Sequence, residues 1–132
     1  QGENEDEFIM FMRSIVVIGE FLVFAPALYF FLKTMFKDLS VKIRLILWFS
    51  IMMLPPALFI DHGHYQFNQI MHGFVLFAIA FVMRDNFILA TVFMVFAVNF
   101  KQTALYFALP FVVYVISRLT IIYHNPNIST QV

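Results

Sequence analysis

Cysteine is absent from this 132-residue chain, and charged residues make up only 12% of it. Without cysteine the chain has no disulfide and no thiolate metal site, so its cysteine content does not indicate whether its compartment is oxidising or reducing. The eight Lys and Arg residues balance the eight Asp and Glu residues, so the net charge is zero. Nucleic-acid-binding proteins typically carry an excess of positive charge, which this chain lacks. A Gly-rich phosphate-binding loop is also missing, which argues against a nucleotide site.

The low content of charged residues is matched by a high content of apolar residues. They make up 62% of the chain, and the mean hydropathy is +0.87, whereas soluble domains contain about 45–50% apolar residues and about 25% charged ones. The apolar residues fall in blocks close to membrane-spanning length, roughly 17–25 residues, and they do not alternate as β-barrel strands do. The sequence therefore predicts an all-α fold, a polytopic transmembrane helical bundle.

About five spans are expected, at residues 14–32, 43–60, 69–83, 87–98 and 104–123. The acidic residues at positions 1–7 suggest a solvated loop end. Pro26 and Pro110 are candidate kinks, and the pair Pro55-Pro56 should break the second span. The chain begins with Gln and shows no signal-peptide pattern. We expect residues 1–132 to form a single transmembrane domain that is an internal piece of a longer polytopic protein.

Basic residues are distributed unequally between the two sides of such a bundle. One side would carry Arg13 and Lys101, and the other would carry six bases: Lys33, Lys37, Lys42, Arg44, Arg84 and Arg118. Because Lys and Arg collect on the cytoplasmic side, the loop at residues 33–44 should be cytoplasmic and residues 61–68 and 99–102 should be luminal or exterior. The N-glycosylation pattern at Asn127 would then lie in the cytoplasm and stay unmodified.

The densest polar chemistry lies at residues 61–68, between two long apolar runs. Together with residues 99–102, expected on the same face of the membrane, it offers eight candidate substrate-binding residues: Asp61, His62, His64, Tyr65, Gln66, Asn68, Lys101 and Gln102. One reading is a metal site, since imidazole and carboxylate suit zinc, iron or manganese, although the two histidines lack the i, i+4 spacing of helical ligand pairs.

Two other readings stay open. The polar groups could recognise an anionic, membrane-borne substrate, with positive charge meeting phosphate and amides meeting sugar hydroxyls. They could instead be structural, with the amides and histidines satisfying the broken backbone after Pro55-Pro56 and Lys101 snorkelling to the interface. Glu20, a carboxylate inside the first span, is open in the same way: it could pair with Arg13 or face a functional interior.

Three segments resemble motifs of a known family, in the family's order. Residues 54–68, LPPALFIDHGHYQFN, resemble the motif D-H-G-H-F-Q-Y-N after a Pro-containing span. Residues 99–111, NFKQTALYFALPF, resemble N-Y-K-Q-M-E-L-Y-x-x-L-P-F, and residues 11–13 resemble an F-M-R that opens an earlier span. Tyr65 and Phe67 exchange the family's Phe and Tyr, and Thr103-Ala104 replaces its Met-Glu pair. The family is that of the endoplasmic-reticulum α-1,3-glucosyltransferases, which have the multi-span GT-C fold.

The resemblance implies an enzyme of N-glycosylation in the endoplasmic-reticulum membrane. Such an enzyme moves glucose from dolichyl phosphate glucose to the mannose arm of a dolichol-linked oligosaccharide, with membrane lipid around it and no cofactor, metal or nucleic acid. Gly63 and Gln102 resemble the branch that adds the first glucose. The family's proposed catalytic aspartate precedes the F-M-R segment, so it lies outside this sequence. The alternatives are a substrate- or ion-binding transporter and an inactive truncated paralogue.

Overall fold

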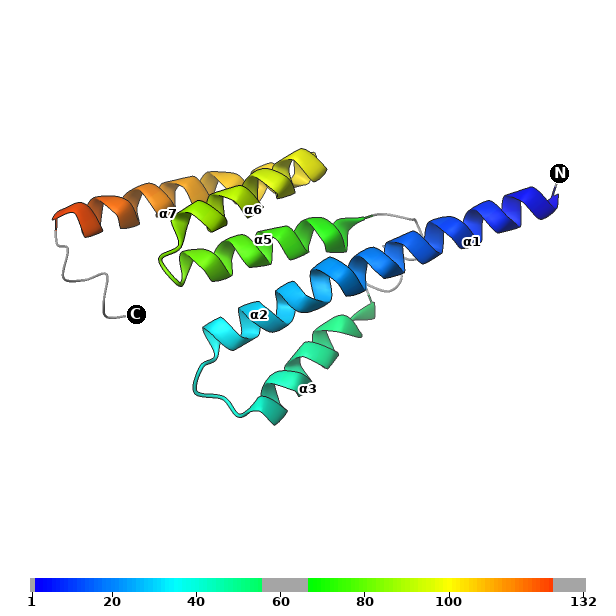
Figure 1. Ribbon diagram of the computed structural model, residues 1–132, viewed down its shortest axis with the longest axis horizontal. Helices are drawn as coiled ribbons and strands as arrows, with labels where there is room; N and C mark the ends of the chain where they lie inside the picture. Colours follow the sequence, from blue (N-terminus) through cyan, green and yellow to red (C-terminus); the bar gives the residue numbers. More distant parts are fainter. Residues whose placement is uncertain (1, 56–66, 125–132) are drawn as a thin grey trace.

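The computed structural model describes residues 2–55 and 67–124, with only the backbone for residues 2–6. Over these two ranges the secondary structure is helical and contains no strand, so the expected all-α fold is confirmed. Figure 1 shows long helices that run roughly side by side, with α5 in the middle of the arrangement. Successive helices run in opposite directions.

The first rod is a helix of three parts: α1 (Gly2–Gly19), the π-helical turn η1 (Glu20–Phe24) and α2 (Ala25–Met35). Pro26 explains the wide turn, because proline lacks the N–H that an α-helix would use at that position and its ring collides with the preceding turn. The expected loop at residues 1–7 is wrong in its conformation, since the helix already begins at Gly2.

Helix α3 (Val41–Met52) returns along α2 and is shorter than the expected span over residues 43–60. Ser40 caps its start by accepting a hydrogen bond from the Ile43 N–H at 3.4 Å. The helix ends before Pro55, as predicted from the restriction that proline places on the residue before it. Its anchor is Trp48, whose Nε1 donates to the carbonyl oxygen of Ala25 on the first rod at 2.8 Å.

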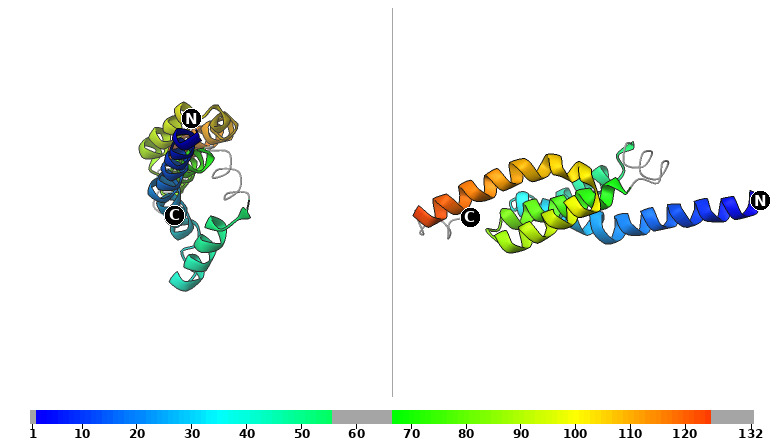
Figure 2. Two further views of the ribbon diagram at one scale, coloured as in Figure 1. Left: turned by 90° about the vertical axis from the view of Figure 1, so that its right-hand side faces the viewer. Right: turned by 90° about the horizontal axis from the view of Figure 1, so that it is seen from above.

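The last three long helices lie within two residues of the expected spans at each end. They are α5 (Asn68–Val82), α6 (Phe87–Phe100) and α7 (Leu105–His124), with a 3₁₀ turn, η3 (Gln102–Ala104), between α6 and α7. The tight turn from α5 to α6 uses Asp85 at φ 54°, and Arg118 of α7 donates to its carboxylate at 3.3 Å. Helix α7 arches in the right-hand view of Figure 2, with Pro110 inside it.

Two apolar clusters hold α5 between its neighbours. One joins α5 to α6 and η3 and contains Met71, Val75, Ala78, Met94, Ala97 and Ala104. The other joins the first rod to α3 and contains Phe24, Ala25, Leu28, Leu32 and Met52, and Leu76 of α5 packs against it. Alanine makes up half of the first cluster, and such small residues let helix backbones approach closely, as in membrane bundles. Helix α5 approaches the first rod closely at Gly73, where a Cβ would lie 3.0 Å from the Cα of Phe24.

The outer faces of the bundle are apolar. Two continuous helical segments, Glu7–Met35 and Gln102–His124, are long and apolar enough to cross a membrane, and none of the most apolar window in the second is buried within the chain. Helices α3, α5 and α6 contain 12, 15 and 14 residues, or about 18–23 Å at about 1.5 Å per residue, against about 30 Å of bilayer core. The number of complete spans stays a prediction.

Candidate functional site

Lys101 stands at the break between α6 and α7 with its backbone held on both sides. It adopts an extended conformation, φ −151° and ψ 131°. Its N–H donates to the Ala97 carbonyl and its own carbonyl accepts from the Ala104 N–H, both at 3.0 Å. The half-buried side chain extends to α5, where Nζ donates a hydrogen bond to Oδ1 of Asn68. This bond joins the two motif segments that the sequence places on one face.

Asn68 is the first residue of α5, and an aromatic contact lies beside its bond to Lys101. The rings of Phe67 and Phe100 meet edge to face, with centroids 6.4 Å apart. Each ring belongs to the residue next to one partner of the hydrogen bond, so the polar contact and the aromatic contact are side by side. The two segments are 33 residues apart in the chain, and these contacts fix their relative position at one end of the bundle.

Further polar side chains lie in the first turns of α5. Gln69 is buried, and His72 is half-buried with its ring edge-to-face against Phe107 of α7 at 6.1 Å between centroids. Glu20 is only 3% exposed. It lies beside the same turns, because a Cβ on the neighbouring Gly19 would meet Ile70 of α5. An intramembrane carboxylate is costly and usually faces protein, and the buried position of Glu20 agrees with that rule.

The remaining sequence candidates differ in what the structure says of them. Gln102 is exposed at the start of η3. The other five, Asp61, His62, His64, Tyr65 and Gln66, lie outside the described residues, so their roles stay predictions. The proposed metal ligands are among these five; in the ranges that the structure does describe, no group of three or more His, Asp or Glu side chains is arranged to hold a metal ion.

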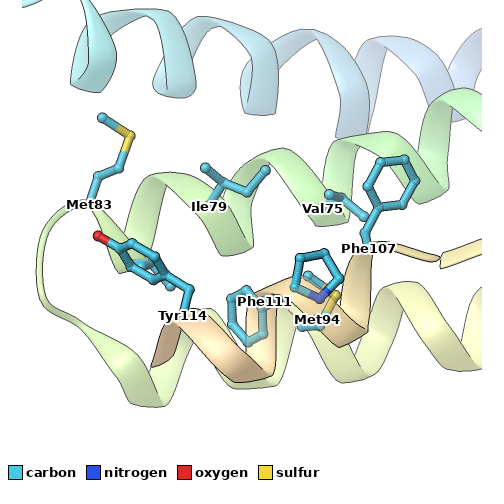
Figure 3. Close-up of a pocket in the computed structure, with 9 residues that line it drawn as sticks. Val75, Ile79, Met83, Met94, Phe107, Phe111 and Tyr114 are labelled. Atoms are coloured by element: carbon cyan, nitrogen blue, oxygen red, sulfur yellow. The ribbon is translucent and has the colours of Figure 1, made fainter. Parts of the chain in front are cut away.

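An apolar cavity of about 360 Å³ opens between α5, α6 and α7. Figure 3 shows Val75 and Phe107 near one end and Met83 and Tyr114 near the other. The hydroxyl of Tyr114 is the main polar group among its lining side chains, which include no carboxylate, imidazole, amine or thiol. Phe107 borders both this cavity and His72, so the cavity begins about one helical turn below the polar end of α5.

Sequence reasoning missed Gln69 and did not foresee the neighbours of Glu20. The sequence identified Glu20 as a costly carboxylate, but it held no sign of which helix that carboxylate would face. The one available signal was Gly19, because a small residue beside a polar one in a membrane span favours close helix packing. The structure supplies the partner helix, α5.

Comparison with known proteins gives a consistent picture. Residues 1–131 match the model of the family described as the ALG6, ALG8 glycosyltransferase family. A protein of Dictyostelium discoideum named probable dolichyl pyrophosphate Man9GlcNAc2 alpha-1,3-glucosyltransferase is 35% identical over 116 residues, which cover 88% of this chain and 22% of the relative. The Schizosaccharomyces pombe protein of the same name is 37% identical, covering 88% of this chain and 23% of the relative.

The Saccharomyces cerevisiae dolichyl pyrophosphate Man9GlcNAc2 alpha-1,3-glucosyltransferase is 36% identical over 110 residues, which cover 82% of this chain and 20% of that enzyme. The chain therefore spans between 20% and 23% of the length of these three curated relatives. No solved structure matches the chain.

Proposed function

The chain belongs to the ALG6, ALG8 glycosyltransferase family, and we propose that it forms part of a glucosyltransferase acting on a dolichol-linked oligosaccharide. The observation that carries this proposal is the family match over residues 1–131. In the proposed reaction, glucose moves from dolichyl phosphate glucose to the mannose arm of the oligosaccharide. The names of the relatives include the acceptor Man9GlcNAc2, which contains no glucose. This supports assignment of the chain to the branch that adds the first glucose.

Lys101 is the described residue best suited to the donor phosphate. An ammonium has three N–H donors, and the bond to Asn68 uses one of them. The glucosyl group leaves a phosphate behind, and a fixed positive charge stabilises the negative charge that develops on that phosphate. In this scheme His64 assists Lys101, with His62 second. Asp61, Tyr65, Gln66 and Gln102 contribute hydrogen bonds to substrate.

The base that activates the acceptor hydroxyl is assigned to a residue outside these 132. Asp61 then orients a histidine or contacts substrate, and no cofactor enters the scheme. The enzyme would span the endoplasmic-reticulum membrane several times and be surrounded by lipid. Residues 61–68 and 99–102 would face the lumen and residues 33–44 the cytoplasm. The opposite directions of successive helices are compatible with this orientation.

Replacing Lys101 by Met in the full-length protein tests the proposal. The assay measures glucose transfer from dolichyl phosphate glucose to the Man9GlcNAc2 lipid in reconstituted vesicles. We expect the donor KM to rise about ten- to hundredfold, because a hydrogen bond to a charged group contributes about 1.5–3 kcal/mol. Lys37→Met is the matched control, since Lys37 is exposed in the turn between α2 and α3. That turn lies at the opposite end of the bundle from the break between α6 and α7 (Figure 1).

The possible outcomes distinguish the proposed enzymatic function from the proposed role of Lys101. Absence of glucose transfer by the unsubstituted protein would refute the enzymatic function and favour an inactive relative. Transfer with both donor KM and kcat unchanged in the Lys101→Met variant would leave the function standing and remove Lys101 from the donor site.

A further inference from the structure

We propose that Asn68 is a positioning residue: its side-chain oxygen holds the Lys101 ammonium at the donor phosphate and leaves the positive charge of that ammonium uncompensated. This inference rests on the proposed function and deepens it. It also changes the role that the sequence suggests for Asn68, because an oxygen committed to Lys101 serves the substrate through the lysine.

The first argument is mechanical. A lysine side chain has a flexible four-carbon stem and a large rotamer entropy, so a lysine at a helix break samples many positions unless something holds its end. The backbone of Lys101 is fixed by its bonds to Ala97 and Ala104. The ring contact between Phe67 and Phe100 holds α5 against the end of α6. The bond from Nζ to Oδ1 then fixes the one part of the lysine that the backbone leaves free.

The second argument concerns charge. An amide oxygen accepts a hydrogen bond without carrying a formal charge, so the pair of Asn68 and Lys101 keeps a net charge of +1. A carboxylate of the same shape would accept the same bond and cancel that charge. Across residues 7–55 and 67–124, no carboxylate forms an ion pair with Lys101. Both side chains are half-buried, where water screens the charge less than it does at an exposed site.

The inference separates two substitutions that a purely structural role would not separate. Asn68→Asp preserves the size and the acceptor but neutralises the lysine. Asn68→Ala preserves the charge but releases the ammonium. We expect the donor KM to rise about tenfold for Asn68→Ala, because the lysine regains rotamer freedom that binding must then remove. We expect a larger rise for Asn68→Asp, approaching that of Lys101→Met, with a smaller change in kcat in each case.

Asn86 offers a matched control for the added charge. It lies in the turn at the opposite end of α5, where its side-chain oxygen accepts from the Leu89 N–H at 3.2 Å and caps α6. Aspartate caps a helix as well as asparagine does. Asn86→Asp therefore adds the same negative charge while keeping its local hydrogen bond, and we expect the donor KM to stay within about twofold of the unsubstituted value.

A double substitution asks whether Asn68 acts through the lysine. In the Lys101→Met background, Asn68→Ala should have little further effect on donor KM, because the group it positions is gone. Thermal unfolding of each variant checks the fold. If Asn68→Ala fails to fold, the comparison of Asn68→Asp with Asn86→Asp decides the matter alone, since both changes conserve volume.

Equal effects of Asn68→Asp and Asn68→Ala, or full additivity of Asn68→Ala with Lys101→Met, would overturn the inference and assign Asn68 a direct contact with substrate or a structural role. Failure of the proposed function has a different signature, which is no glucose transfer by the unsubstituted protein. In that case binding of dolichyl phosphate, measured by thermal shift, still tests the positioning role. Retention of that binding in Asn68→Asp would overturn it.

Discussion

Gly73 is the position where the structure predicts the sharpest difference between two similar substitutions. A Cβ built on Gly73 would lie 3.0 Å from the Cα of Phe24 and 3.1 Å from its backbone nitrogen. Two carbon atoms in favourable contact lie about 3.5–4.0 Å apart, so alanine at this position would push α5 away from the first rod by roughly 0.5 Å. A backbone cannot rotate away as a side chain can, and the whole helix has to move.

Two terms of opposite sign decide the size of the effect. Overpacking of a well-packed interior costs about 1–3 kcal/mol, whereas replacing a mid-helix glycine by alanine gains up to about 1 kcal/mol in helix propensity. We therefore expect Gly73→Ala to reduce the free energy of unfolding by about 1 kcal/mol, with Gly73→Leu much worse. Gly19→Ala is the matched comparison, because there the Cβ would meet the Cδ1 end of Ile70, a flexible side chain that can change rotamer.

The measurement is the unfolding temperature of the full-length protein in detergent, followed by intrinsic fluorescence. Gly73→Ala should unfold at a lower temperature than the unsubstituted protein, and Gly19→Ala should be near neutral or slightly stabilised. The reasoning is refuted if Gly73→Ala is as stable as the unsubstituted protein while Gly19→Ala is clearly destabilised. That result would mean that α5 and the first rod do not pack at Gly73 as described.

Two further predictions concern other parts of the chain. Trp48→Phe removes the donor to the Ala25 carbonyl. Because hydrogen bonds between membrane helices contribute about 0.6 kcal/mol on average, we expect a small fall in the unfolding temperature. A rise would contradict a stabilising role for the bond between α3 and the first rod. Asn127 lies outside the described residues, and the proposed orientation puts it in the cytoplasm. Treatment of the natural protein with a glycosidase should therefore cause no mass shift at Asn127, and a glycan found there would reverse the proposed orientation.

The sequence by itself determined the helical class and most of the helix positions. The apolar blocks at residues 69–83, 87–98 and 104–123 predicted α5, α6 and α7 closely, because a chain that cannot hydrogen-bond to water must satisfy its backbone within each segment. Pro55 marked the end of α3 for an equally local reason. The family was also readable, because residues 54–68 and 99–111 preserve contiguous motifs, and the match over residues 1–131 confirms it.

Local rules were less successful where two tendencies compete. The polar start of the chain suggested a loop, yet the helix begins at Gly2, because a polar segment next to a long helix can continue it when its residues have adequate helix propensity. Helix α3 stops at Met52, three residues before Pro55, and residues 56–60 of the expected second span lie outside the described residues. Proline disfavours the α conformation in the residue before it, which for Pro55 is Leu54.

Only the tertiary structure decided which side chains meet. Nothing in the sequence pairs Asn68 with Lys101, places Glu20 beside the first turns of α5, or sets Gly73 against the backbone of Phe24. Each of these contacts depends on the rotation of one helix about its axis relative to another. An apolar span that is hydrophobic all around carries little periodic signal for that rotation, so packing of small and large side chains fixes it.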